Sequence, residues 1–453
     1  MSRTSRRRSS RPSSTSSVAD AAGVADRPCR VWIINHYADT PDRPTGTRHY
    51  SLARGVVRRG GNATVFAAGR SNWTGREERL RGHAMARSRS FNGVRFVWVW
   101  TFPYRGNTWR RIVNMLSFAF AVCVVQLIRP APDVVVGSSV HPFAALAGWV
   151  IARTRGARFI YEVRDLWPQT LIDLGALGER SLGARGLAAL ETLLVRRAEI
   201  VITVLPGMGD YLAGRGLPTH HVRYLPNGAD LPTSRVSDPK DERAATADAL
   251  TPTLTDLRRR RKDGEVTFAY VGSYGRVNRL EVILRAYGLA VGLTNRPISL
   301  VLVGDGPEKP ALQELSAELG IEGVTFVDPI PKSRVPDLLS AVDVGLVHTT
   351  RNPVYRFGTS FNKVFDYMAA AIPIAFACAT AHDPVEASGA GFTVEPDDPV
   401  ALARAMAALA DTPSAARHQM GKAGRLFLER EHDSMKLGDR FADIVGCRVG
   451  PVR

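Results

Sequence analysis

Two long series of alternating strand-like and helix-like segments dominate this sequence, and they restrict the chain to the α/β class. From Arg30 to Tyr224, short β-branched runs alternate with segments that carry apolar residues at helical spacing. A second series of the same kind begins at Val266. Strands that are joined through helices form parallel sheets with helices on their faces. The sequence therefore predicts two facing, doubly wound, Rossmann-like domains with ligand crevices at the carboxyl ends of their strands.

The expected strands are short runs of β-branched and other apolar residues. They are Val31–Asn35, Ala63–Ala67, Arg95–Trp100, Asp133–Val136, Arg158–Val163, Ile200–Val204 and Val222–Leu225, then Thr267–Val271, Ser299–Val303, Val324–Val327, Val344–Val347, Ile374–Ala377 and Phe392–Val394. Helices are expected at, among others, His49–Arg59, Pro142–Arg153, Gly186–Arg197, Leu280–Val291, Pro310–Leu319, Arg334–Ala341 and Asn362–Ala370, and Ser414–Cys447 is expected to be wholly helical.

Changes in composition predict the domain boundaries. Residues 1–28 hold six arginines, two aspartates and no apolar stretch, which is typical of a disordered basic tail and not of a secretory signal. An N-terminal domain is expected at 29–231 and a C-terminal domain at 265–430, followed by a C-terminal helix and tail at 431–453. Between the domains, residues 232–264 lose periodicity and are expected to form a linker with an exposed insertion.

The net charge of +17 suits anionic partners such as phosphates or the anionic face of a membrane. Much of the excess lies in the tail and in the run Arg258–Lys262, and no recognition motif appears, so we expect no nucleic-acid partner. The four cysteines are far apart in the sequence without a Cys-x-x-Cys pair. Neither a disulfide framework nor a zinc site is predicted, and a reducing cytosol fits best.

One segment, Trp109–Arg129, is a candidate for membrane contact. Its apolar stretch is interrupted by Asn114, Ser117 and Gln126 and is shorter than a span requires, so a buried helix is the preferred interpretation. Aromatic and basic residues just before the stretch favour a second one, in which the helix lies against a membrane surface.

Glycine-rich turns mark the expected ligand edge of the second domain. Val271-Gly272-Ser273-Tyr274-Gly275-Arg276 follows a strand, and Val303-Gly304-Asp305-Gly306-Pro307 repeats the plan. Small residues let the backbone approach an anion, whose charge a helix N-terminus and Arg276 would offset. Glycines in such turns also serve the turn alone.

The third element of this edge is Phe357-Gly358-Thr359-Ser360-Phe361-Asn362-Lys363, which leads into a helix containing Asp366. Lys363 could bind a diphosphate, and the carboxylate of Asp366 could accept hydrogen bonds from a ribose diol. The alternative is a surface ion pair between Lys363 and Asp366, three residues apart on one helix face.

These motifs resemble glycosyltransferase family 4, the retaining nucleotide-sugar enzymes with the GT-B fold. The similarity runs from about Val31 to about Val445 and includes Gly46-Thr47-Arg48-His49, Ser138-Ser139-Val140-His141-Pro142, Arg164-Asp165-Leu166-Trp167-Pro168 and Asn362-Lys363-Val364-Phe365-Asp366-Tyr367-Met368-Ala369. The last two are most similar to a branch that makes bacterial surface polysaccharides, including N-acetylfucosamine transferases.

The resemblance implies a donor site in the second domain. Asp366 matches the second acid of the family's Glu-x7-Glu motif, which binds the donor's ribose, whereas Gly358 stands where the first acid would fall. Arg276 and Lys363 are expected to bind the diphosphate. The other expected donor-binding residues are Gly272, Ser273, Gly275, Gly304, Val327, Thr359, Ser360 and Asn362.

In the first domain, Arg164 and Asp165 end a strand where many relatives have His-Asp. Asp165 could orient or deprotonate an acceptor hydroxyl, and Arg164 could hold a phosphate. A structural pairing of Arg164 with Asp165 or Glu162 is equally compatible with the sequence. On the acceptor side we also expect Gly46, Thr47, Arg48 and His141.

The resemblance implies a retaining transferase that moves a sugar from a nucleoside-diphosphate donor, expected to be UDP-linked, to a glycan or polyprenyl-linked acceptor. We expect no metal and no cofactor, a cytoplasmic location, and peripheral contact with the inner face of the plasma membrane. A nucleotide-sugar epimerase of the same fold and a non-catalytic nucleotide-sugar-binding protein remain alternatives.

Overall fold

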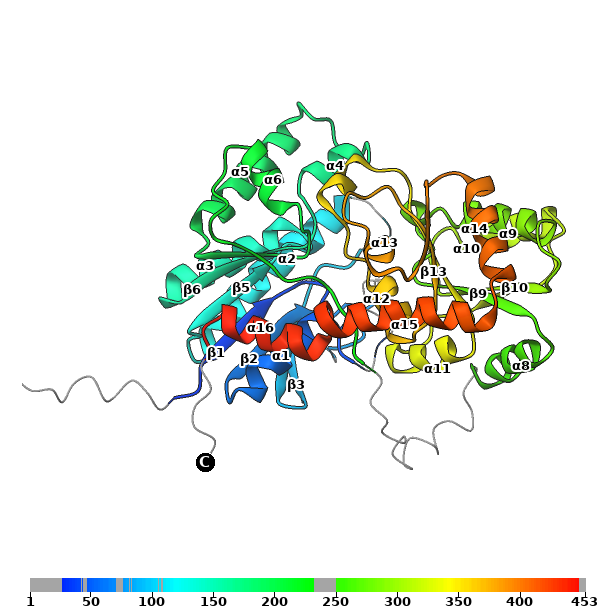
Figure 1. Ribbon diagram of the computed structural model, residues 1–453. Helices are drawn as coiled ribbons and strands as arrows, with labels where there is room; N and C mark the ends of the chain where they lie inside the picture. Colours follow the sequence, from blue (N-terminus) through cyan, green and yellow to red (C-terminus); the bar gives the residue numbers. More distant parts are fainter. Residues whose placement is uncertain are drawn as a thin grey trace, which may run out of the picture.

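The computed structural model describes residues 27–41, 43, 47–70, 76–80, 82, 84–104, 106, 109–231 and 250–447. Two sheets, each covered by helices, form two domains that lie side by side (Figure 1). The prediction of two doubly wound α/β domains is confirmed. Most of the expected tail, residues 1–26, and the linker segment 232–249 lie outside the described residues.

The N-terminal domain is built on an eight-stranded sheet of order β3-β4-β2-β1-β5-β6-β7-β8. Its strands are β1 (Arg30–Ile34), β2 (Asn62–Ala68), β3 (Ala86–Phe91), β4 (Val94–Val99), β5 (Val134–Ser138), β6 (Arg158–Val163), β7 (Ile200–Thr203) and β8 (Val222–Tyr224). Its helices are α1 (Arg48–Arg58), α2 (Trp109–Val125), η1 (Gln126–Ile128), α3 (Pro142–Arg155), α4 (Gln169–Asp173), α5 (Leu182–Arg197) and α6 (Met208–Gly214). Every pairing is parallel except β3 with β4. Both faces of the central strands are buried, which explains their nearly continuous apolar sequences.

Strand β3 is absent from the strands expected from the sequence. Its sequence alternates arginine and serine, and nearly all of its side chains are exposed at the edge of the sheet. A charged edge strand protects a sheet against pairing with other chains, but it carries no hydrophobic pattern by which it could be found.

The C-terminal domain has a six-stranded, all-parallel sheet of order β11-β10-β9-β12-β13-β14. Its strands are β9 (Val266–Val271), β10 (Ile298–Val303), β11 (Val324–Val327), β12 (Val344–His348), β13 (Ile374–Ala377) and β14 (Gly391–Val394). Its helices are α8 (Leu250–Lys262), η2 (Arg276–Asn278), α9 (Leu280–Val291), α10 (Lys309–Glu318), η3 (Lys332–Arg334), α11 (Val335–Ser340), η4 (Pro353–Phe357), α12 (Asn362–Ala369), α13 (Pro384–Ser388), α14 (Pro399–Asp411) and α15 (Ser414–Glu431).

Helix α8 corrects the expectation of an irregular linker up to Gly264. Leu250, Leu254 and Leu257 recur at helical spacing and are buried in the core of the C-terminal domain. The basic run from Arg258 to Lys262 forms the last turns of this helix, where cations interact favourably with the helix dipole. The charge run therefore ends a helix of the second domain.

The C-terminal segment returns to the first domain. The expected single helix is interrupted at His432 and Asp433, and the Asp433 carboxylate caps α16 (Ser434–Ile444) by accepting from the Met435 amide at 2.8 Å. Figure 1 shows α15 and α16 running in line across both domains. Helix α16 packs on α1, where a Cβ atom on Gly55 would lie 1.9 Å from the carbonyl oxygen of Gly438.

The two ends of the described chain meet in the N-terminal domain. The sulfur atoms of Cys29 and Cys447, which are 418 positions apart in the sequence, lie 2.6 Å apart as free thiols. The hydrogen bond from Cys447 lowers the pKa of Cys29. Residues just before β1 and just after α16 therefore pack together.

We expect Gly55→Ala to destabilise the protein by about 1–3 kcal/mol, because the added methyl group would force α1 and α16 apart. Thermal unfolding followed by circular dichroism measures the effect. The matched control is Gly186→Ala in exposed helix α5, where nothing lies within 4 Å of the new Cβ and alanine should be neutral or stabilising. Equal melting temperatures for the two variants would contradict the close packing of α1 and α16.

Candidate active site

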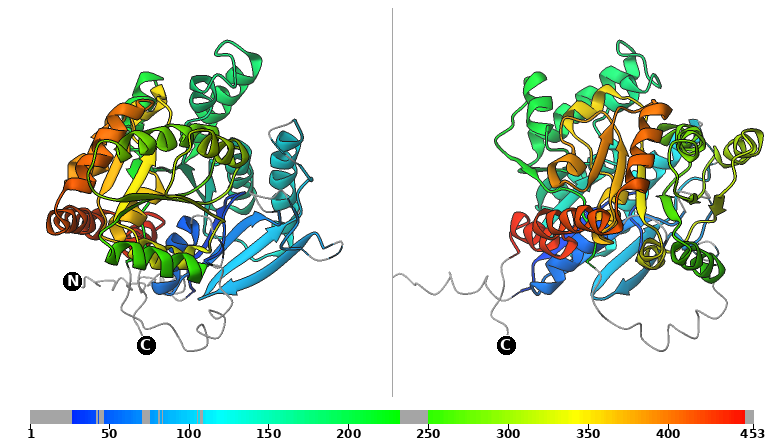
Figure 2. Two further views of the ribbon diagram at one scale, coloured as in Figure 1. Left: turned by 90° about the vertical axis from the view of Figure 1, so that its right-hand side faces the viewer. Right: turned by 45° about the vertical axis from the view of Figure 1, so that its right-hand side comes forward.

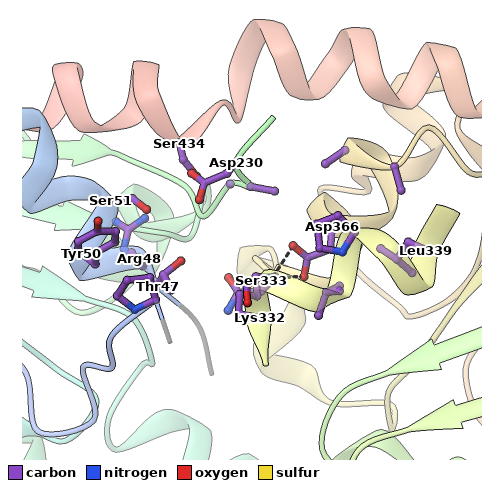
Figure 3. Close-up of a pocket in the computed structure, with 18 of the residues that line it drawn as sticks. Thr47, Arg48, Tyr50, Ser51, Asp230, Lys332, Ser333, Leu339, Asp366 and Ser434 are labelled. Atoms are coloured by element: carbon purple, nitrogen blue, oxygen red, sulfur yellow. Dashed lines mark hydrogen bonds and ion pairs between the residues drawn. The ribbon is translucent and has the colours of Figure 1, made fainter. Parts of the chain in front are cut away.

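A pocket of about 550 Å³ lies between the two domains (Figure 3). The start of α1 lines one side, and η3, α11 and α12 line the other. The chain segment Gly228–Asp230 and helices α15 and α16 also contribute to the wall. Four predicted site residues line this pocket, namely Thr47, Arg48, Asn362 and Asp366. The structure thus brings residues of both predicted halves to one cavity.

Asp366 faces Lys332 and not Lys363. The Nζ atom of Lys332 donates to both carboxylate oxygens of Asp366 at 2.5 Å, as the dashed lines in Figure 3 mark. The two side chains are largely buried, with 26% and 16% of their surfaces exposed. The alternative of a surface ion pair between Lys363 and Asp366 is therefore wrong. Lys332 is a pocket residue that the sequence analysis missed, because it lies in a turn without a recognisable motif.

Lys363 projects from the start of α12 toward the end of β9. Its Nζ atom donates to the Tyr270 hydroxyl at 2.8 Å and to the Asn278 side-chain oxygen at 3.2 Å. The ammonium also lies 4.2 Å from the centre of the Tyr270 ring. Among the described residues no carboxylate pairs with it, and burial lowers the pKa of Lys363 to about 7. A cation without a counter-ion is held at this strand end.

The glycines of the two predicted loops have different roles. A Cβ atom on Gly272 would lie 3.3 Å from Nζ of Lys363, so this glycine gives the lysine room. A Cβ atom on Gly304 would lie 1.9 Å from the Gly272 carbonyl oxygen, so Gly304 permits the contact between the loops. Gly275 has open space around it. Ser273 accepts from the Asn278 side chain through its carbonyl and its hydroxyl, which fixes the first loop.

Arg276 lies on the same loop but points outward. It is 91% exposed, and its Nε atom is 3.4 Å from a Glu308 carboxylate oxygen. Thus the structure places one of the two expected phosphate ligands, Lys363, against the glycine loop, and the other on the surface beside it. Val327 ends the edge strand β11, where its carbonyl accepts from the Gly304 amide at 3.0 Å.

Arg48 was expected on the acceptor side, but a buried network occupies its guanidinium. Its Nε atom donates to Glu162 at 2.9 Å, and its terminal nitrogens donate to the carbonyls of Leu225 and Pro226. His49 lies 2.7 Å from the other oxygen of Glu162. Burial alone would raise the pKa of Glu162, but His49 and Arg48 hold it well below its usual range. Arg48 therefore fixes α1 to the strand ends.

Asp165 and Arg164 follow β6 and do not occupy the Figure 3 pocket. Asp165 is exposed at the protein surface. Desolvation by the neighbouring protein raises the pKa of its carboxyl group, and the charge of Arg164 opposes this rise. Burial raises the pKa of Tyr355 in η4, and Asp165 adds to that rise. Helix α4, which follows Asp165 in the chain, contacts η4 of the C-terminal domain. The Arg164 Nε atom is buried with no hydrogen-bond partner among the described residues.

His141 is a buried cap and not an open acceptor contact. Its Nδ1 atom accepts from the Ala144 amide at 3.2 Å at the start of α3, and its Nε2 atom lies 2.7 Å from Nδ1 of His36. Burial lowers the pKa of His141 to about 3. Both ring nitrogens are engaged, so the side chain positions α3 and β1. Gly46, the remaining acceptor-side prediction, lies outside the described residues.

Residues 358–360 contact the N-terminal domain. The Ser360 hydroxyl accepts from the Asn227 amide at 3.0 Å, and its carbonyl accepts from the Asn227 side chain at 2.6 Å, so Ser360 is held at the domain boundary in this structure. Gly358 has φ of 97°, and a Cβ atom there would lie 2.6 Å from the ring of Pro206. Thr359 lies between them, partly exposed.

Two family models match the chain: a glycosyl transferase 4-like domain over residues 45–228 and glycosyl transferases group 1 over residues 265–412. The chain is 26% identical over 250 residues to the putative colanic acid biosynthesis glycosyl transferase WcaI of Escherichia coli K12, a match that covers 54% of this chain and 58% of that protein. It is 24% identical over 292 residues to the probable glycosyltransferase WbjE of Pseudomonas aeruginosa, covering 64% and 68%.

The fold also matches solved structures. The Anabaena protein HepE, in a complex with UDP and glucose, superposes with a TM-score of 0.61 at 15% identity, covering 91% of this chain and 98% of that one. At this identity the comparison establishes the architecture alone. The two facing domains expected from the sequence are therefore those of the GT-B fold.

We expect the pKa of Lys363 to be about 7, well below that of an ordinary lysine, because burial disfavours its charged form. The pH dependence of acetylation by acetic anhydride, resolved by peptide mass spectrometry, reports the midpoint for each lysine. Lys422, which lies on α15 in the same chain, is the internal control for the reaction with the reagent. A midpoint near 10 for Lys363 would contradict the proposed environment.

Proposed function

The chain belongs to glycosyltransferase family 4, and we propose that it is a retaining transferase that moves a sugar from a UDP-linked donor to a glycan or polyprenyl-linked acceptor. The proposed setting is bacterial surface-polysaccharide synthesis at the cytoplasmic face of the membrane. The names of WcaI and WbjE support the class of reaction, and the UDP in the HepE structure supports the nucleotide. The N-acetylfucosamine branch is supported by the sequence motifs alone.

One observation carries the proposal: Lys363 presents a cation without a carboxylate partner, among the described residues, at the glycine loop after β9. The same lysine stands in the first turn of α12, whose N-cap residue Phe361 provides no side-chain cap. Backbone amides at a helix start and a nearby ammonium suit a diphosphate. Loss of the sugar leaves charge on that diphosphate, so positive groups placed there stabilise the transition state.

The interdomain pocket suits the nucleoside. Asp366 could accept hydrogen bonds from the ribose hydroxyls, and the contact with Lys332 orients its carboxylate. Asn362 lines the same pocket one residue before Lys363. In this arrangement the ribose would contact Asp366 and the phosphates would contact Lys363, one turn away on α12.

Asp165 is the proposed acceptor residue. It lies at the end of β6 with an exposed edge and near η4 of the donor domain, so it could orient an acceptor hydroxyl or accept its proton. In a retaining transfer the hydroxyl oxygen attacks the anomeric carbon on the face that the diphosphate leaves. The bond to the phosphate oxygen breaks with its electron pair on the diphosphate, which can receive the hydroxyl proton. A protein nucleophile is not required.

We expect the protein to be stabilised by UDP in a thermal-shift screen and to turn over at least one UDP-sugar with a lipid-linked acceptor. Lys363→Ala should weaken UDP binding about ten- to hundred-fold, the loss of one charge-assisted hydrogen bond to a buried anion. Arg276→Ala should cost less, because Arg276 is exposed and contacts Glu308. The control is Arg285→Ala, an exposed arginine on α9. Unchanged UDP affinity in Lys363→Ala would overturn the donor site.

The binding of UDP should also weaken as pH rises above about 7. The negatively charged diphosphate favours the protonated lysine, so binding must take up a proton once Lys363 is neutral in the free protein. Calorimetry in buffers of different ionisation enthalpy measures this uptake. The Lys363→Arg variant, charged at every pH in the range, should lose the dependence.

Asp165→Asn should lower kcat by about a hundred-fold or more, the usual contribution of a general base, while leaving UDP affinity within a factor of two or so. Steady-state kinetics and UDP titration separate the two effects. Equal losses of kcat and of UDP affinity would indicate a structural role. A product formed from donor alone, without acceptor, would instead favour the epimerase alternative.

A further inference from the structure

The outer face of helix α2 is the largest feature that the proposed site does not use. Seven large apolar side chains of α2 and η1 are exposed, from 46% to 86% of their surfaces. They are Trp109, Ile112, Leu116, Phe120, Val124, Leu127 and Ile128. In the left view of Figure 2 this cyan helix stands at the outer margin of the N-terminal domain. A stripe of this length is unusual on a protein surface that meets only water.

The stripe has the spacing of one helix face. Residues 109, 112, 116, 120, 124 and 127 follow one another at intervals of three or four, which keeps them on one side of an α-helix. The opposite side, with Phe118, Val122 and Val125, is buried in the domain core. Helix α2 is therefore apolar on both sides, although its own domain covers only one of them.

The inner contacts of α2 argue against a membrane-spanning orientation. By length and composition Trp109–Ile128 could span a bilayer. However, the Asn114 side chain donates to the Phe102 carbonyl at 2.6 Å, and the Ser117 hydroxyl accepts from the Phe102 amide at 2.8 Å. His36 stacks on Phe118 with 4.4 Å between ring centres. These bonds fix α2 to the folded domain.

The charges around α2 suit an anionic surface. No aspartate or glutamate occurs between Glu78 and Asp133, so α2 has no acid. Arg110 is exposed at the start of the helix, and Arg155 donates to the carbonyl and side-chain oxygens of Gln126 at its other end. Asp133, the next acid along the chain, is paired with Arg27. A second copy of the chain would set arginines against arginines here, whereas anionic lipid headgroups would neutralise them.

We propose that the outer face of α2 binds the surface of an anionic lipid bilayer, with Trp109 to Ile128 lying in the plane of the headgroups. Tryptophan and arginine at one end and apolar side chains along the face are the features that such interfacial helices use. Because His36 at the end of β1 contacts Phe118, this docking would bring the strand ends of the first domain near the membrane. Binding to lipid does not depend on the donor site.

Co-sedimentation of the full chain with vesicles tests this proposal. We expect binding to vesicles of phosphatidylcholine with phosphatidylglycerol, weaker binding to phosphatidylcholine alone, and a decrease with added salt. The triple variant Ile112→Gln, Leu116→Gln, Phe120→Gln should bind anionic vesicles about ten-fold less well or worse. The matched control replaces three similarly exposed leucines, Leu289, Leu293 and Leu426, with glutamine and should bind like the original chain.

The controls separate the other outcomes. The basic first 28 residues are present in both triple variants. If these residues alone bind the vesicles, the α2 variant will bind as well as the original chain, and the proposal is wrong. Hydrogen exchange across residues 109–128 should slow when vesicles are added to the original chain. If vesicles have no effect, and ultracentrifugation shows a dimer that the α2 variant abolishes, the face is a contact between copies and the proposal is wrong. UDP affinity measured in the same variant reports separately on the donor site.

Discussion

The chain crosses between its two domains twice, and the two crossings are hydrogen-bonded to each other. The Ala229 amide donates to the His432 carbonyl at 3.2 Å, and the Ser434 amide donates to the Ala229 carbonyl at 3.1 Å. Gly228 makes this possible, since a Cβ atom there would lie 1.9 Å from the His432 oxygen. Helix α16 then packs on α1 through Gly55 and Gly438. These contacts fix the relative position of the two domains, and they lie next to the interdomain pocket. A substitution at one of these crossings should therefore shift the residues that line the pocket, even though it does not contact them.

Two proposed site residues, Lys363 and Asp366, lie one turn apart on helix α12 and contact different partners. Lys363 reaches the glycine loop after β9, and Asp366 reaches Lys332 in the interdomain pocket. A lysine that is buried without a carboxylate is unfavourable for the unliganded protein, since burial disfavours its charge. The diphosphate of the proposed donor would stabilise the charged form of Lys363 and so reduce this penalty, which would contribute to the affinity.

Much of the fold follows from the sequence, because strands buried on both faces leave continuous apolar runs. Strand β3 and helix α8 were missed for the opposite reason: the first is polar and exposed, and the second follows a segment without periodicity. For the site, local motifs found Lys363 and Asp366 but not their partners. Lys332 carries no motif of its own, and contacts such as Arg48 with Glu162 join residues more than a hundred positions apart. Arg48, His141 and Ser360 were assigned to ligands because the sequence does not show that other protein groups already occupy them.

The meeting of Gly358 with Pro206 has a consequence for anyone who would redesign this protein. The Glu-x7-Glu motif that this segment resembles has its first acid where this chain has Gly358, and a designer could try to restore that acid. The ring of Pro206, in the N-terminal domain, already occupies the space that this acidic side chain would need. An acidic side chain at position 358 would therefore push the two domains apart. The substitution would have to be combined with a smaller residue at position 206.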